Sequence, residues 1–257
     1  MIFKNKKIRY FCGFIILLTC LFLQIFHSNS EIVNRKFQDN EIEVYTEQKY
    51  GIAIVAFSGT FDLIYHPTKV LPLKDVAQYF EYRYIMNGSF FEGDRLNAKH
   101  AGWLSILGMN HSSIKEDPQL SHVVRYNPSS GAIEFVPLEE FEPLRSDNYI
   151  EFQTGPLILH NNKLAEKYIR ESINGLGEYK RALLAYTNDK QKYFIITKEV
   201  VALDDLGEYL LTLPIFSDKI LNVINLDGGP SVALYSKNFP ELNYNEEDRL
   251  PILLTID

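Results

Sequence analysis

Short apolar and alternating stretches recur along the chain after residue 40, separated by turns rich in glycine, proline and asparagine. The alternation at 41–45 and 82–86 is typical of half-buried strands, and the continuous apolar runs at 51–57 and 220–226 are typical of buried strands. Further strands are expected at 61–65, 132–136, 152–159, 181–186, 193–197 and 252–256. The turn at 58–60 predicts that the strands at 51–57 and 61–65 form a hairpin, and 252–256 is expected at a sheet edge.

Helical spacing of apolar residues is less common. It occurs at 72–80, where Pro72 lies near the start, and again at 203–213. Strand signals therefore outnumber helix signals, and hairpin spacing dominates over strand–helix–strand spacing. The pattern predicts an α+β fold: a single domain with a mixed, twisted, mostly antiparallel sheet and a few packed helices.

The first thirty residues differ from the rest. A basic start is followed by an apolar run over 11–26 and then by small residues at Ser28 and Ser30. This is the pattern of a secretory signal, which is either cleaved or retained as a membrane anchor over 10–26. The sequence thus predicts an exported protein, periplasmic or extracellular, whose folded domain spans 41–257 and which meets a membrane only through its N-terminal segment.

The composition limits the chemical groups and the partners that the exported part can use. The fractions of hydrophobic (46%) and charged (23%) residues are those of an ordinary globular protein. Both cysteines, Cys12 and Cys20, lie in the leader, which excludes disulfide and cysteine–zinc chemistry in the exported part. Without the four basic leader residues, 22 bases face 33 acids, a net charge near −11. Such a surface argues against nucleic acid as a partner.

The apolar run at 220–226 ends in Asp227-Gly228-Gly229-Pro230-Ser231. The two glycines permit a tight turn, and proline suits the first position of a helix. We expect a strand, a glycine turn and a helix start, with the carboxylate at the rim and backbone N–H groups forming an anion cradle. The alternative is a turn that only reverses the chain.

A second strand end carries polar residues at Asn87-Gly88-Ser89, where the amide is suited to a sugar hydroxyl or a water. Its alternative is an ordinary Asn-Gly hairpin turn. Gly155-Pro156 introduces an apolar stretch, and Arg181 is the first residue of a strand. Lys99 and His100, in a loop rich in glycine and polar residues, are expected to be solvated.

Together, Asn87-Gly88-Ser89-Phe90-Phe91, Thr154-Gly155-Pro156-Leu157, Arg181-Ala182 and Leu226-Asp227-Gly228-Gly229-Pro230-Ser231 form an ordered set. This set resembles the phosphodiester glycosidase family over roughly residues 45–257. Two departures from the family pattern are Val232, in place of a second Ser or Thr, and the absence of glycine from 183–185. The resemblance implies hydrolysis of the glycosyl C1–O bond of a sugar-1-phosphodiester, with a glycan or sugar phosphodiester as substrate and no cofactor.

The resemblance also implies a set of site residues. Asp227 would be the nucleophile or base at the anomeric carbon, and Arg181 would clamp the phosphate with help from the N–H groups of Gly228 and Gly229. Asn87 and Ser231 would hold sugar hydroxyls or the attacking water. The substrate-binding set is completed by the residues that line the same turns: Gly88, Ser89 and Gly155.

Two other functions remain open on the sequence. One is a metal-dependent phosphodiesterase with Asp227 as a ligand, although no H-x-E, H-E-x-x-H or D-x-D run is present. The other is a catalytically inactive carbohydrate-binding or envelope-assembly module on the same fold. Convergence of Asn87, Arg181 and Asp227 on one place would favour an enzyme.

Overall fold

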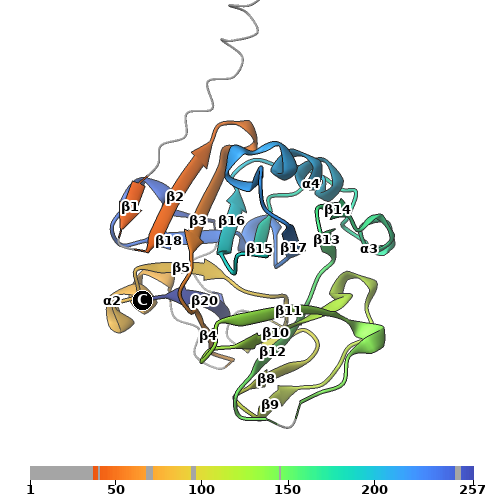
Figure 1. Cartoon of the computed structure of the whole chain (residues 1–257). Coiled ribbons are helices and arrows are strands. Elements are labelled where there is room, and N and C mark those ends of the chain that lie inside the picture. Colours follow the sequence, from red (N-terminus) through yellow and green to blue (C-terminus); the bar gives the residue numbers. More distant parts are fainter. Residues whose placement is uncertain (1–36, 40, 68–71, 94–96, 145, 247–249) are drawn as a thin grey trace, which may run out of the picture. The chain divides into compact units, whose positions relative to one another are not determined.

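The computed structural model describes residues 37–39, 41–67, 72–93, 97–144, 146–246 and 250–257 (Figure 1). The predicted signal at 1–30 and the anchor at 10–26 lie outside the described residues. The described residues belong to one compact unit, built as an α+β domain of three α-helices and many antiparallel strands. The fold class is therefore as predicted. None of the described helices combines the length and the apolar character needed to cross a membrane.

Sheet 1 has eight strands in the order β1-β2-β3-β16-β15-β17-β13-β14. Their bounds are Phe37–Asp39 (β1), Ile42–Glu47 (β2), Ile52–Phe57 (β3), Lys192–Thr197 (β16), Ala182–Thr187 (β15), Leu221–Asn225 (β17), Leu157–His160 (β13) and Lys163–Leu164 (β14). β3 and β16 are buried at every position, because sheet 1 is covered on both faces. This explains their continuous apolar runs.

Sheets 2 and 3 have five strands each, in the orders β19-β18-β5-β20-β4 and β11-β10-β12-β8-β9. Sheet 2 comprises Tyr244–Asn245 (β19), Ala233–Ser236 (β18), Tyr84–Asn87 (β5), Ile252–Ile256 (β20) and Asp62–Tyr65 (β4). Sheet 3 comprises Ala132–Pro137 (β11), His122–Asn127 (β10), Ile150–Thr154 (β12), Leu104–Ile106 (β8) and Met109–Ser112 (β9). A small ribbon pairs β6 (Phe91–Glu92) with β7 (Lys99–His100).

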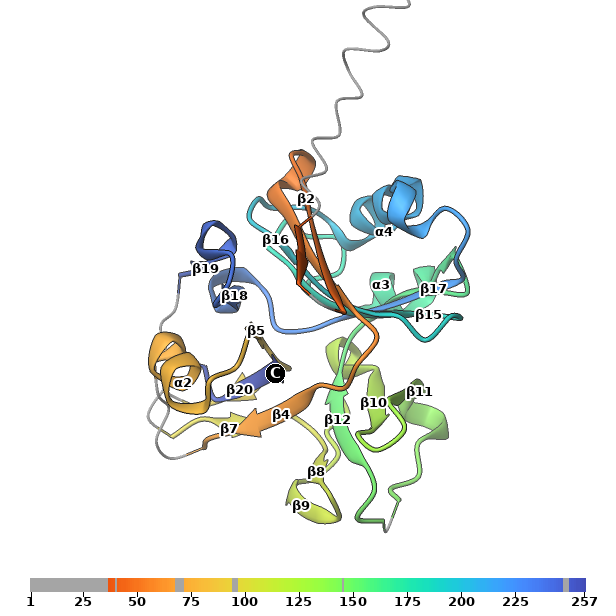
Figure 2. The same cartoon turned by 60° about the vertical axis from the view of Figure 1, so that its left-hand side comes forward.

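The α-helices are Leu73–Phe80 (α2), Glu166–Glu171 (α3) and Leu203–Thr212 (α4); short 3-10 turns are Lys49–Gly51 (η1), Pro118–Leu120 (η2), Leu138–Glu140 (η3), Pro214–Phe216 (η4), Gly229–Ser231 (η5) and Pro240–Leu242 (η6). The helix predicted at 72–80 is α2, with Pro72 as its N-cap. α4 covers the outer face of sheet 1, and α2 packs on sheet 2 (Figure 2).

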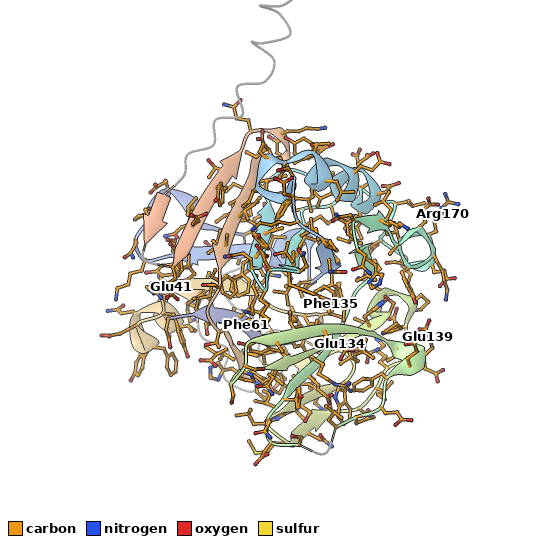
Figure 3. All side chains as sticks on the ribbon, viewed as in Figure 1. Glu41, Phe61, Glu134, Phe135, Glu139 and Arg170 are labelled. Atoms are coloured by element: carbon orange, nitrogen blue, oxygen red, sulfur yellow. The ribbon has the colours of Figure 1, made fainter. Side chains whose placement is uncertain are left out.

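The main core lies where the inner faces of the three sheets meet. It joins Val55 and Leu184 of sheet 1, Met86 of sheet 2 and Tyr126 of sheet 3. Phe61, labelled in Figure 3 between the upper and lower sheets, stacks on Tyr126 with ring centroids 3.9 Å apart, and its N–H donates to the Tyr126 hydroxyl at 2.9 Å. Burial of these aromatic rings fixes sheet 3 against the other two.

Three details of the predicted topology were wrong. β3 and β4 do not form a hairpin: β3 pairs within sheet 1, whereas β4 pairs with β20 in sheet 2. The strand at 252–256 lies between β5 and β4 instead of at an edge, because both its faces are buried. The sheets are also not mixed, since every pairing among the described strands is antiparallel.

Candidate active site

The Asp227 turn follows β17 directly. The Leu226 N–H donates to the Ala182 carbonyl at 2.8 Å, which extends the β17–β15 ladder to the turn, and Asp227 is half-buried. The predicted strand and glycine turn are present, and the predicted helix start is a 3-10 turn with Pro230 within its first two positions, not the start of an α-helix. Only the three-residue turn η5 follows, and β18 begins at Ala233 because the chain enters sheet 2 there beside β5.

Both glycines of the turn are required by geometry. A side chain at Gly228 would place its Cβ 2.8 Å from the Lys180 carbonyl oxygen, and Gly229 has a φ of +59°. The Gly229 N–H already donates to that same carbonyl at 2.9 Å. Gly229 therefore holds the turn on the segment that leads into β15. Its N–H is not available for the phosphate, although the sequence led us to expect it. Ser231 is buried in η5, where its N–H donates to the Gly228 carbonyl at 3.2 Å.

Asn87 clamps the turn from the opposite side. Its Nδ2 donates to the Asp227 carbonyl at 2.7 Å, and its Oδ1 accepts from the Ala233 N–H at 3.0 Å. The Asp227 N–H in turn donates to the Gly88 carbonyl at 3.2 Å. The Asn87 amide is thus occupied by backbone groups on both sides of η5. It positions Asp227, and the sequence-based expectation that it grips a sugar hydroxyl does not match this placement.

The remaining predicted substrate-binding positions converge on the same region. Gly88 lies against β20, where an added Cβ would come 2.5 Å from Ile252 Cγ2. The buried Ser89 hydroxyl donates to the Gln153 carbonyl at 2.6 Å. The Gly155 N–H donates to the Asn225 carbonyl at 3.2 Å, after which a cis peptide bond leads into Pro156. The segments around residues 87, 155 and 227 therefore meet, although they are far apart in the sequence.

The backbone of Arg181 lies at the turn, but its guanidinium points to other backbone groups. Leu183 pairs with Asn225, so the ladder places Arg181 opposite Asp227. The side chain is only 3% exposed and donates to three backbone carbonyls, those of Val201, Asn174 and Gly177. Burial lowers the pKa of Arg181 to about 10. The guanidinium fastens the loop at 174–177, so the role of an open phosphate clamp does not match its placement.

The sequence analysis did not single out Lys180, whose carbonyl accepts the Gly229 N–H of the turn, or Lys198. Lys180 forms an ion pair with Glu246, which also accepts from the Tyr244 hydroxyl at 3.0 Å. The ammonium groups of Lys180 and Lys198 lie 5.5 and 5.8 Å from the Tyr244 ring centroid. Burial lowers the pKa of Lys198, whereas the hydrogen bond to Glu246 raises that of Lys180. Lys180 directly precedes Arg181 and was an equally good candidate for the phosphate-binding cation. Nothing in the sequence indicates such a role for Lys198.

Asn225 was also missed. Its Nδ2 donates to the Gly155 carbonyl at 3.0 Å and to the Leu226 carbonyl at 2.8 Å, so it ties two of the converging segments together. Its Oδ1 is buried and accepts no hydrogen bond within the described part of the chain. A strand interior gives no sequence signal for such a residue, because an asparagine there reads as an exposed position.

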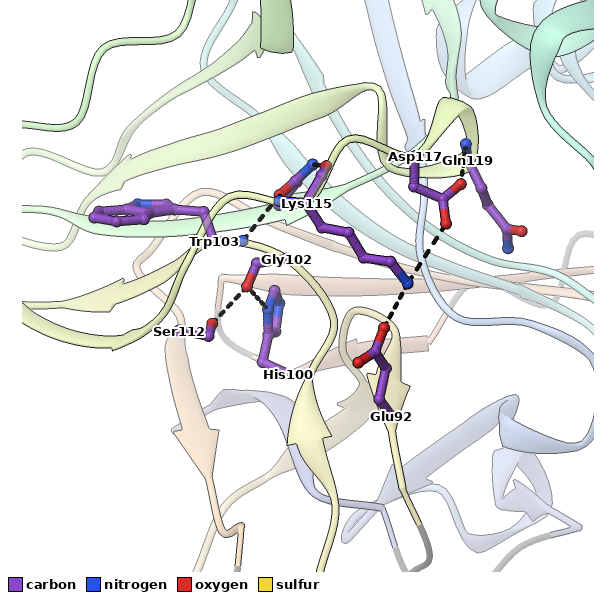
Figure 4. Close-up of polar contacts among 9 residues, drawn as sticks. Glu92, His100, Gly102, Trp103, Ser112, Lys115, Asp117 and Gln119 are labelled. Carbon is purple, nitrogen blue, oxygen red and sulfur yellow. Dashed lines mark hydrogen bonds and ion pairs between the residues drawn. The ribbon is translucent and has the colours of Figure 1, made fainter.

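Polar contacts, some buried and some exposed, join Glu92 to the segment 100–119 (Figure 4). Gln153 bonds to the backbone of Trp103, Lys115 and Leu120, and Lys115 bridges Glu92 and Asp117. Lys99 is exposed as expected. His100 is not solvated: it is 3% exposed, and its ring nitrogen Nδ1 lies 3.0 Å from the Gly102 carbonyl. Burial lowers the pKa of His100 to about 4.

No group of three or more His, Cys, Asp or Glu side chains suited to a metal ion occurs among the described residues.

Comparison with known proteins yields matches among solved structures only. No family model matches the chain, and no curated protein matches it. The catalytic domain of zebrafish N-acetylglucosamine-1-phosphodiester alpha-N-acetylglucosaminidase, auto-inhibited by its pro-peptide, superposes with a TM-score of 0.56 at 10% identity, covering 87% of this chain and 81% of that one.

Two bacterial structures are similar as well. A proposed exported protein of Burkholderia pseudomallei K96243 has a TM-score of 0.54 at 8% identity, covering 84% of this chain and 74% of that one. A hypothetical protein from Synechocystis has a TM-score of 0.51 at 12% identity, covering 86% of this chain and 61% of that one. At these identities the comparisons establish a fold shared with these proteins and nothing finer.

Proposed function

We propose that this protein is an exported hydrolase that cleaves the glycosyl C1–O bond of a sugar-1-phosphodiester, with Asp227 as the reacting carboxylate. The observation that carries the proposal is the 2.7 Å hydrogen bond from Asn87 Nδ2 to the Asp227 carbonyl, across 140 residues of sequence. It joins two of the four motifs at a half-buried carboxylate. The fold shared with a glycosidase that acts on a phosphodiester supports the same class of substrate.

The chemistry needs few protein groups. The leaving group is a phosphate monoester, which departs as an anion, so the general acid of ordinary glycosidases is dispensable. Asp227 acts as the nucleophile at the anomeric carbon, or as the base that activates water there. A fixed cation beside the departing phosphate lowers the barrier, because its attraction grows as negative charge develops.

Lys180 and Lys198 supply that cation in this proposal. Both ammonium groups flank Tyr244, and Lys180 meets the turn through its carbonyl. A phosphate would displace Glu246 from Lys180. Arg181 becomes a positioning residue that holds the loop at 174–177 and the strand opposite Asp227. An Arg181→Lys variant, which keeps the charge but not the fork of donors, is then expected to loosen this loop to protease while leaving phosphate binding largely intact.

The test is the Asp227→Asn variant, assayed with alkyl-phospho-α-N-acetylglucosamine and a panel of other sugar-1-phosphodiesters. We expect turnover to fall by about two to three powers of ten with unchanged thermal unfolding. Asp205→Asn, on the exposed face of α4, is the matched control. Products decide the bond: free reducing sugar with the phosphate left on the aglycone supports the proposal. Release of a phosphorylated sugar in an EDTA-sensitive reaction would indicate metal-dependent P–O cleavage instead.

A second candidate function is a carbohydrate-binding or envelope-assembly module without catalysis. It is favoured by the engagement of Asn87 and Arg181 with backbone groups, because two of the three side chains expected to be catalytic then face the protein. Saturable binding of sugar phosphodiesters with no turnover, in both the parent chain and the Asp227→Asn variant, would select this function.

A further inference from the structure

A groove of about 680 Å³ lies between α3 and the 3-10 turns η2 and η3. We call it the Tyr168 groove; its lining includes Asp117, Ser121, Glu139, Lys167, Tyr168 and Glu171. Figure 3 shows Glu139 at the right-hand end of sheet 3, below the helix that carries Arg170. The volume is ample for one or two sugar rings.

The aromatic wall of the groove is held in place. The Tyr168 ring packs edge-on against His122, with centroids 4.5 Å apart, and its hydroxyl donates to Glu139 Oε1 at 3.0 Å. Burial, helped by Glu139, raises the pKa of Tyr168 to about 12, so the phenol remains a neutral donor. The Lys167 ammonium lies over this ring, 5.0 Å from its centroid, so a sugar that stacks there displaces it. Because the half-buried ring is already fixed at its edge and its hydroxyl, it loses little conformational entropy when a flat apolar sugar face binds.

The Ser121 hydroxyl on the groove wall is oriented by the buried ring of His122. Ser121 Oγ lies 2.8 Å from Nδ1 of His122, a fully buried ring whose Nε2 has no hydrogen-bond partner among the described residues. Burial lowers the pKa of His122 to about 4, so the ring is neutral at ordinary pH. Whichever of the two atoms carries the proton, the Ser121 oxygen keeps one donor or acceptor position for a ligand.

The charge of the groove selects the ligand. Asp117, Glu139 and Glu171 outnumber Lys167, and hydrogen bonding lowers the pKa of Glu139, which is therefore ionised. Carboxylates accept hydrogen bonds from sugar hydroxyls and attract amines, whereas they repel phosphate. This groove therefore differs in sign from the lysine-flanked turn at Asp227.

The groove lies next to the candidate active site. A Cβ at Gly155 would come 2.9 Å from Ser121 Oγ, so the two segments are in contact. Gln119 accepts from Asn174 Nδ2 at 3.3 Å, and the Asn174 carbonyl accepts from Arg181. The groove wall is therefore joined to Gly155 and to the loop that Arg181 holds.

We propose that the Tyr168 groove binds a carbohydrate without phosphate, neutral or bearing a free amine, stacked on Tyr168 and hydrogen-bonded by Ser121 and Glu139. Such a site would anchor a glycan next to the Asp227 turn. The binding does not require hydrolysis, so its failure and the failure of the proposed catalytic function are separate results.

The experiment titrates the full chain carrying Asp227→Asn, which prevents turnover, with three probes: an N-acetylglucosamine tetrasaccharide, a glucosamine tetrasaccharide and N-acetylglucosamine-1-phosphate. We expect calorimetry to detect the two tetrasaccharides. Tyr168→Ala should weaken both by about tenfold, and Tyr168→Phe should retain most of the affinity because the ring remains. Tyr79→Ala is the control, since Tyr79 is 82% exposed on α2. N-acetylglucosamine-1-phosphate binding should be unaffected by either Tyr168 variant.

A second variant covers the case in which Tyr168→Ala does not fold. Glu171 is exposed at the end of α3, so Glu171→Lys leaves the core intact, and it should weaken the glucosamine probe several-fold more than the N-acetylated one. The proposal is overturned if neither tetrasaccharide binds, or if both bind with affinities that the folded Tyr168 and Glu171 variants leave unchanged.

Discussion

Glu151 is a carboxylate in the middle of sheet 3 with only 1% of its surface exposed. Arg125 Nε donates to it at 2.8 Å, and Trp103 Nε1 donates to its other oxygen at 3.3 Å. Arg125 also lies over the Phe141 ring and donates to the Glu142 carbonyl at 2.8 Å. A buried charge is tolerated here only because each partner is in place.

Glu151→Gln is therefore expected to lower the free energy of unfolding by about 3 kcal/mol, because Arg125 loses its buried carboxylate partner and is left with the exposed Glu134, 3.8 Å away. Denaturant unfolding followed by fluorescence measures this change. The control is Glu166→Gln, which breaks the exposed Glu166–Arg170 pair on α3 and should change stability by no more than about 0.5 kcal/mol. Equal effects at the two sites would contradict the assignment.

The sequence located the segments of the candidate site but not the direction in which their side chains point. Its motifs located Asn87, Gly155 and Asp227, because strand ends followed by glycine have few alternatives. They did not reveal that the Asn87 amide and the Arg181 guanidinium face backbone carbonyls, since a polar side chain suits a ligand and a backbone group equally well. Asn225 was missed because only tertiary packing brings the Gly155 segment within reach of its amide.

At the level of elements, α4 approaches sheet 1 closely at Gly207. A Cβ on this residue would lie 2.7 Å from Leu164 Cδ2 and 2.9 Å from Ile158 Cγ2. Glycine is ordinarily unfavourable within a helix, so its position here reflects the contact with β13 and β14.

Gly207→Ala should thus destabilise the protein by about 1–2 kcal/mol, since overpacking outweighs the gain in helix propensity. The midpoint of urea unfolding is the measurement. Glu208→Ala, at the next and exposed position of α4, provides the matched control and should be nearly neutral. A stabilised Gly207→Ala variant would mean that α4 can move away from the sheet without cost.

Element identity was more predictable than element pairing. The helix α2 and the hairpin of β15 and β16 follow from local patterns, and both are present. The pairing of β4 with β20 is non-local, and no local signal distinguishes it from a β3–β4 hairpin. The Ser58-Gly59-Thr60 turn carries the chain from sheet 1 to sheet 2 rather than back along β3.

For the whole molecule, acid sensitivity follows from His100 and His122. Burial lowers the pKa of each ring to about 4, opposed at His100 by the Gly102 carbonyl and at His122 by Glu139. In the unfolded chain, histidine takes up a proton below about pH 6.5. The unfolded state therefore binds more protons between about pH 6.5 and pH 4, so stability is lost as the pH falls through this window.

Stability should drop by about 2 kcal/mol per buried histidine between about pH 7 and pH 5. Urea unfolding at a series of pH values tests this, with His122→Phe expected to flatten the dependence. Replacing the exposed His111 by Asn is the control and should leave the slope unchanged. A pH dependence that is identical in the parent and in the His122 variant would refute the role of that ring.

The strand order of sheet 2 has one more consequence. β5, which ends in Asn87, obtains both of its neighbours, β18 and β20, from the last part of the chain, and Ala233 lies 146 residues beyond Asn87. A ribosome delivers residue 87 long before either partner exists, so β5 must wait unpaired while sheet 3 is already able to form. The clamp of Asn87 on the Asp227 turn therefore forms only after residue 233 has been synthesised, and sheet 2 is completed only with β20.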